Sequence, residues 1–89
     1  MTEQPDEPYE ESFERYQEAR ELMEQGQFRP AIDMFARSFH LAPHAKTAEL
    51  LGECHAKLGE LTDAVMGLAA ATTLGRSGRA PFLLAEILV

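Results

Sequence analysis

The chain lacks several features that define common functional classes. Its 89 residues include one cysteine and no tryptophan. A single cysteine cannot form a disulfide within the chain. No apolar run approaches the roughly 20 residues that a membrane-spanning helix needs, and the acidic start carries no apolar secretory leader. We therefore expect no membrane insertion and a cytoplasmic location, with a fragment of a longer protein as an open alternative.

Basic residues are also scarce. The sequence holds 15 acids and 8 bases, for a formal net charge of −7. Residues 1–25 contain nine of the acids and two of the bases, so this segment alone carries −7 (2 − 9). A chain with this charge and no basic stripe repels phosphates. We therefore expect no nucleic-acid partner.

Catalytic and metal-binding motifs are missing as well. The chain has no phosphate loop, no nucleophile elbow and no Cys-x2-Cys spacing. Cys54 and His55 are neighbours and would point to different faces of a helix, while Pro43 interrupts the helical spacing of His40 and His44. We therefore expect no enzymatic activity, no metal site and no cofactor, and interpret Cys54 as a small buried hydrophobe.

What the sequence does contain is a self-match at a spacing of 33 residues (59 − 26). The spacing relates pairs and triplets of glycine, alanine and large residues: Gly26 and Gly59, Phe28 and Leu61, Ala31 and Ala64, Phe35 and Leu68, Leu41 and Leu74, then Ala19, Gly52 and Ala85, and Leu22, His55 and Leu88. Such repetition is typical of folds in which each unit buries its apolar face against a neighbour. We expect about two and a half units.

The apolar spacing within each unit predicts helices, and no segment has the alternation of a strand. Glycine and proline indicate where the helices begin and end. Residues 1–10 are expected to form a flexible acidic arm. Five helices should follow: from a cap at Ser12 to Gln25, from Phe28 to before Pro43 with Pro30 in the first turn, from near Ala45 to Gly59, from a cap at Thr62 or Asp63 to Leu74, and from near Pro81 to the end. The prediction is an all-α chain of antiparallel hairpins.

These residues resemble the tetratricopeptide repeat, in which a first helix carries Leu-Gly and a second carries Ala followed by a large residue. The second unit supplies Ala48, Leu51, Gly52, His55, Gly59, Leu61, Ala64, Leu68 and Ala71, and the first supplies Ala19, Leu22, Gly26, Phe28, Ala31, Phe35, Ser38 and Pro43. The resemblance implies an α-solenoid over residues 11–89, divided into 11–43, 44–77 and a terminal half-repeat at 78–89. The small residues are expected where helices cross closely. The period is one below the family's usual value and equals that of ankyrin repeats, but the T-P-L-H turn of ankyrin repeats is missing.

The resemblance also implies a concave groove formed by the first helix of each pair. Its lining would be Phe13, Tyr16, Arg20, Met23, Lys46, Glu49, Glu53, Lys57, Phe82 and Glu86. The acids at its centre would repel the C-terminal carboxylate that some family members bind. We expect a scaffold or adaptor that holds a peptide or helix of a partner protein. One alternative is a small chaperone of a bacterial secretion system, and another is that these charges are only a solvated face.

The last nine residues are nearly all apolar. Helical spacing lets Leu88 pack on the fourth helix and places Leu83 and Ile87 where a sixth helix would otherwise cover them, and an exposed apolar strip of this kind often marks an interface. We expect self-association through these residues, most simply as a homodimer. The alternative is that the tail folds back and covers itself.

Overall fold

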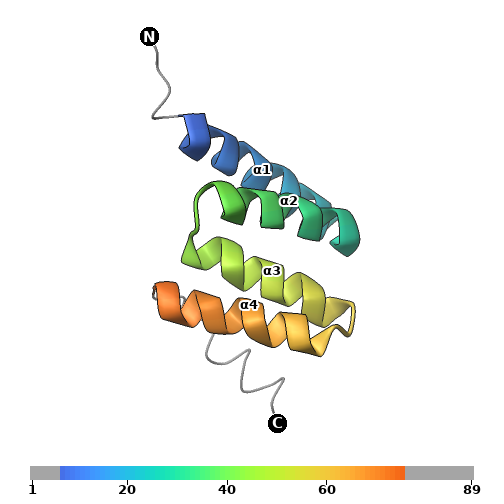
Figure 1. Ribbon diagram of the computed structural model, residues 1–89. Coiled ribbons are helices and arrows are strands. Elements are labelled where there is room, and N and C mark those ends of the chain that lie inside the picture. Colours follow the sequence, from blue (N-terminus) through green and yellow to red (C-terminus); the bar gives the residue numbers. More distant parts are fainter. Residues whose placement is uncertain (1–6, 76–89) are drawn as a thin grey trace.

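The computed structural model describes residues 7–75, which form four α-helices and no strand (Figure 1). The helices are α1 (Glu7–Glu24), α2 (Phe28–Leu41), α3 (Ala45–Lys57) and α4 (Leu61–Leu74). Over these residues the predicted all-α class is confirmed. The expected fifth helix, together with Phe82, Leu83, Glu86, Ile87 and Leu88, lies outside the described residues.

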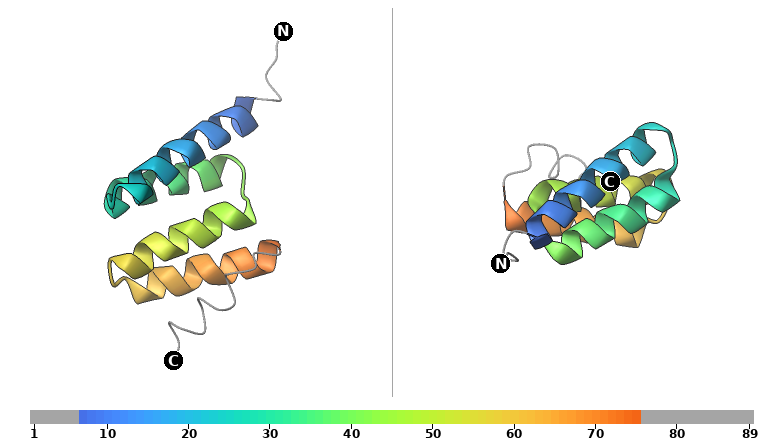
Figure 2. Two further views of the ribbon diagram at one scale, coloured as in Figure 1. Left: turned by 180° about the vertical axis from the view of Figure 1, so that it is seen from behind. Right: turned by 90° about the horizontal axis from the view of Figure 1, so that it is seen from above.

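The helices are arranged in chain order, and each packs beside the next and runs in the opposite direction (Figure 1). Short turns join α1 to α2 and α3 to α4, which makes two hairpins. Packing of α2 on α3 connects the hairpins, and the left view of Figure 2 shows the same order from behind. Predicted antiparallel hairpins are therefore present over residues 7–75.

The two hairpin turns repeat the 33-residue spacing in their backbone geometry. Gly26 and Gly59 both have a φ of +77°, which a residue without a side chain adopts readily. In each turn, the amide after the glycine donates to the carbonyl five residues earlier, at 2.9 Å. This is the Schellman ending of a helix. Helices α1 and α3 end just before these glycines, so the predicted helix ends are confirmed. The bounds of α2 and α4 also differ by 33 at both ends (61 − 28 and 74 − 41).

Two predicted helix starts are wrong. Helix α1 begins at Glu7, because Pro8 fits the first turn, so residues 7–10 are helical and do not belong to an arm. Ser12 is not a cap; it is buried within α1, where its Oγ donates to the Ser38 carbonyl at 2.9 Å. The N-cap of α4 is Glu60, not Thr62 or Asp63, because the Glu60 carbonyl already accepts from the amide at position 64 at 2.9 Å.

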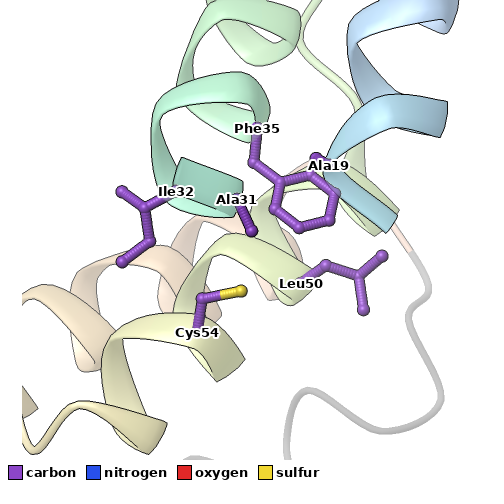
Figure 3. Packing of buried hydrophobic residues seen from close by; sticks show 6 residues of the cluster. All are labelled: Ala19, Ala31, Ile32, Phe35, Leu50 and Cys54. Carbon is purple, nitrogen blue, oxygen red and sulfur yellow. The ribbon is translucent and has the colours of Figure 1, made fainter. Parts of the chain in front are cut away.

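A shared hydrophobic core joins the first three helices. Figure 3 shows Phe35 extending from α2 toward Ala19 of α1 and Leu50 of α3. Cys54 closes the same cluster from α3. A second cluster, formed by Ala48, Leu68 and Ala71, joins α3 to α4. The small residues expected at close crossings are buried as predicted: Ala19, Ala31, Gly52, Ala64 and Ala71.

One close crossing, between α3 and α4, involves Gly67, a glycine that the sequence pattern did not single out. A Cβ built on Gly52 of α3 would lie 2.9 Å from Cγ of Leu68, and one built on Gly67 of α4 would lie 3.0 Å from Cα of Gly52. Real Cβ atoms rarely approach other atoms this closely. The two helices therefore approach backbone to backbone at this pair of glycines.

Charged pairs cover one face of the first hairpin. Arg15 lies 3.6 Å from Glu11, 3.5 Å from Glu14 and 3.0 Å from Glu18, measured between nitrogen and oxygen atoms. Arg37 of α2 reaches Glu11 at 3.1 Å.

Between residues 7 and 75, no helix is both long enough and apolar enough to cross a bilayer.

Candidate partner-binding site

A cleft of about 370 Å³ lies between α1 and the start of α3. The connection from α2 to α3 passes along it and forms part of its wall. Its lining comes from three segments: Tyr9, Ser12, Phe13 and Tyr16 of α1, Ala42, Pro43 and His44 of the connection, and Lys46 and Thr47 of α3. The cleft is therefore built by two different hairpins.

The α1 wall is aromatic. Tyr9 and Phe13 are one helical turn apart and are 70% and 60% exposed. Tyr16 continues the row but is half-buried, because its ring packs edge-on against Phe35 with centroids 5.9 Å apart. Arg20 extends the row, and its guanidinium carbon lies 5.9 Å from the centroid of the Tyr16 ring. The buried Phe35 thus holds Tyr16 in place, whereas Tyr9 and Phe13 remain exposed.

The opposite wall of the cleft has smaller and more polar side chains. His44 is the N-cap of α3, and its Nδ1 accepts a hydrogen bond from the Lys46 amide at 3.1 Å. This bond fixes the ring at the mouth of the cleft. The Lys46 ammonium lies 3.6 Å from Oε1 of Glu49 one turn further along α3. The side chains on this wall are therefore held by contacts within α3.

The structure brings together only part of the predicted groove. Phe13, Tyr16 and Lys46 line the cleft, and Arg20 does not line it but contacts the ring of Tyr16. Other predicted positions lie elsewhere: Met23 packs against the core, Glu53 is half-buried, and Lys57 is exposed in the last turn of α3. Phe82 and Glu86 are outside the described residues.

Glu49 does not fit its predicted position on an open surface. The structure leaves it 1% exposed, whereas the repeat pattern placed it facing the groove. The pattern identifies which positions of α3 face away from the core of its own hairpin, but it contains no information about what packs over them. A buried carboxylate requires compensating partners, and the Lys46 ammonium is one of these.

Sequence reasoning missed Tyr9 and His44 as lining residues. Tyr9 was assigned to a flexible arm, although it precedes Phe13 by four residues and Tyr16 by seven, which is the spacing of one helix face. That spacing was the available signal. The role of His44 depends on a cap bond, and the sequence gives no direct sign of that bond.

A second polar group links the tips of the two hairpins. Arg29 of α2 binds both carboxylate oxygens of Glu60, and Nδ1 of His55 lies 2.8 Å from Oε1 of the same group. The Arg29 bond, followed by the His55 bond, lowers the pKa of Glu60 from 4.5 to about 2. Ligand atoms of His55, Glu60 and Asp63 lie within 4.8 Å of one another, which is close enough to hold a metal ion. The Arg29 guanidinium already binds the Glu60 carboxylate, so we interpret the group as a clamp between hairpins.

Cys54 offers no nucleophile to this surface. Its side chain is buried in the core shared by α1, α2 and α3 (Figure 3). Burial, with a smaller effect from the nearby Glu53 charge, raises the pKa of its thiol to about 11. The thiol is therefore protonated near neutral pH and unreactive in the folded chain.

No protein-family profile matches the chain, and a search of curated proteins returned no similar sequence. A function must therefore be argued from the site itself. The cleft supplies exposed aromatic surface, a concave shape and one basic side chain, Lys46. These properties suit the binding of another molecule.

Proposed function

We propose that the protein is an interaction module of the tetratricopeptide type that holds a segment of a partner protein in the cleft between α1 and α3. One observation carries the proposal: two exposed aromatic rings, Tyr9 and Phe13, lie on one wall of a cleft of about 370 Å³. Aromatic side chains beside a concavity are typical of interfaces, where they supply much of the binding energy.

The gain from covering the two rings is large enough to matter. If a partner buries on the order of 200 Å² of their apolar surface, transfer from water yields about 5 kcal/mol. Association itself costs several kcal/mol. Further contacts from the walls of the cleft are therefore needed, and a partner segment that fills the cleft would provide them.

The proposed relation to tetratricopeptide repeats has separate support. Consecutive hairpins with matching Schellman turns occur at the 33-residue spacing, and alanine or glycine occupies the close crossings. In such repeats the first helix of each pair faces the bound peptide. Here α1 and α3 hold those places, and both line the cleft.

Site-specific crosslinking can identify the partner. The photoreactive residue p-benzoylphenylalanine would replace Phe13 in one sample and Leu61 in another, where Leu61 is an apolar residue 53% exposed at the start of α4. A protein captured from the source cells at position 13, and not at position 61, would then be purified. Its binding to the parent chain and to variants would be measured by calorimetry.

We expect Phe13→Ala to weaken that purified partner at least tenfold, because the exposed ring is a central contact. Leu61→Ala should leave the affinity within about twofold, since surface truncations away from an interface are nearly neutral. Melting temperatures of both variants should match the parent. Equal affinity of the partner for the parent and Phe13→Ala would exclude the cleft as its binding site.

A further inference from the structure

The exposed face of α1 carries a second row of side chains parallel to the aromatic one. The aromatic row is Tyr9, Phe13, Tyr16 and Arg20, at offsets of four, seven and eleven from its first member. The second row has the same offsets and begins one residue later: Glu10, Glu14, Gln17 and Glu21. Residues at these offsets follow one line along a helix. All four members of the second row are exposed.

Among residues 7–75, the positive charges near the cleft are already paired. Arg20 lies 3.9 Å from Glu24, and the Lys46 ammonium lies 3.6 Å from Glu49. Arg15 turns toward Glu11, Glu14 and Glu18, as described above. Helix α1 as a whole has seven acids and two bases, a net charge of −5 (2 − 7). The helix that carries the aromatic row therefore has a net negative charge.

Resting on the proposed function, we infer that the occupant of the cleft is a basic amphipathic segment of a partner protein. Its apolar side chains would cover Tyr9 and Phe13, and its Lys or Arg side chains would lie along the row that begins at Glu10. An acidic segment would meet the net negative charge of α1, which opposes association. The acidic row and the aromatic row lie on adjacent lines of one helix. A single amphipathic helix of the partner can therefore contact both rows.

Two synthetic peptides test the charge preference. Each would be a helix of about fourteen residues, or four turns, with leucine at the same positions. One would carry lysine and the other glutamate at every polar position. Binding to the full chain would be measured by fluorescence anisotropy at low and high salt. We expect the lysine peptide to bind, with affinity that falls as salt rises, and the glutamate peptide to bind at least tenfold more weakly.

Matched variants separate local recognition from net charge. Glu10→Lys places a positive charge in the second row, whereas Asp33→Lys makes the same change in charge at an exposed position of α2 outside the cleft. We expect Glu10→Lys to weaken the lysine peptide about tenfold more than Asp33→Lys at about 0.1 M salt, because screening at that concentration limits the reach of an exposed charge to about 10 Å. Equal weakening by both would overturn the inference.

The remaining outcomes distinguish this inference from the proposed function. If the glutamate peptide binds as tightly as the lysine peptide and Phe13→Ala weakens both, the cleft is a binding site but its preference is not basic. If the lysine peptide binds and Phe13→Ala has no effect, that peptide binds outside the cleft and the inference fails, whereas the proposed function is still decided by the crosslinking experiment. If neither peptide binds, the inference is wrong, and the crosslinking experiment above decides the proposed function by itself.

Discussion

Replacing Gly67 with alanine should destabilise the protein, although the intrinsic preference of a helix favours the opposite result. Alanine in a helix interior is more favourable than glycine by about 1 kcal/mol. A Cβ at position 67, however, would lie 3.0 Å from both Cα and the amide nitrogen of Gly52, and 3.1 Å from the Ala48 carbonyl oxygen. All three are backbone atoms, so only a separation of α3 from α4 can relieve the contact.

Overpacking of this kind costs about 1–3 kcal/mol. Subtracting about 1 kcal/mol for helix propensity leaves a net loss of about 0–2 kcal/mol. For a chain of this size, each 1 kcal/mol lowers the melting temperature by roughly 4–8 °C. The sign of the change is therefore more informative than its size.

The assay is thermal and urea unfolding followed by far-ultraviolet circular dichroism. Ala69→Gly, an exposed position in the same helix, provides the matched control. It should lose about 1 kcal/mol through helix propensity alone. Stabilisation of the chain by Gly67→Ala, by the amount that the control loses, would show that α3 and α4 do not approach backbone to backbone.

Three further predictions concern the core and the clamp between the hairpins. Ala31→Leu and Ala64→Leu should each cost about 1–3 kcal/mol, because both sites are fully buried; unfolding midpoints equal to the parent would contradict this packing. Glu60 has a pKa lowered to about 2 from 4.5, so its bond to Arg29 stabilises the fold fully above 4.5 and is lost as the pH falls toward 2. The parent should therefore exceed Glu60→Gln in stability at neutral pH by a margin that shrinks with acid, and a constant margin would refute the linkage. Cys54 should react with iodoacetamide far more slowly in the folded chain than in denaturant, since it is buried with a pKa raised to about 11; equal labelling rates would place the thiol at the surface.

Helix ends were the most predictable feature of this chain. Gly26 and Gly59 end their helices because a left-handed residue is needed there and glycine adopts that geometry without strain. Helix starts were less predictable, because several polar residues can serve as caps. Ser12 has the chemistry of a cap, yet its hydroxyl is used in the core, bonded to the Ser38 backbone. Local sequence does not distinguish these two uses of a serine.

The close crossing at Gly67 could not be read from the repeat, because its equivalent in the first unit is Met34 (67 − 33). Met34 is half-buried against the core, so the two hairpins are not packed alike at that position. Helix ends follow from the conformation of one residue. The distance between two helices depends on the side chains of both, and a spacing rule does not predict it.

The location of the candidate site follows from the repeat, but the side chains that line it do not. The 33-residue spacing relates Tyr9 to Ala42 and Phe13 to Lys46, and all four residues line the cleft. The cleft therefore lies between equivalent positions of two consecutive units, and neither hairpin contains it alone. The spacing could predict that Phe13 and Lys46 would share a groove. The difference between the walls, aromatic on α1 and small or basic on α3, comes from residues that the repeat leaves free to vary, and under the proposed function that difference would set which partner segment the cleft accepts.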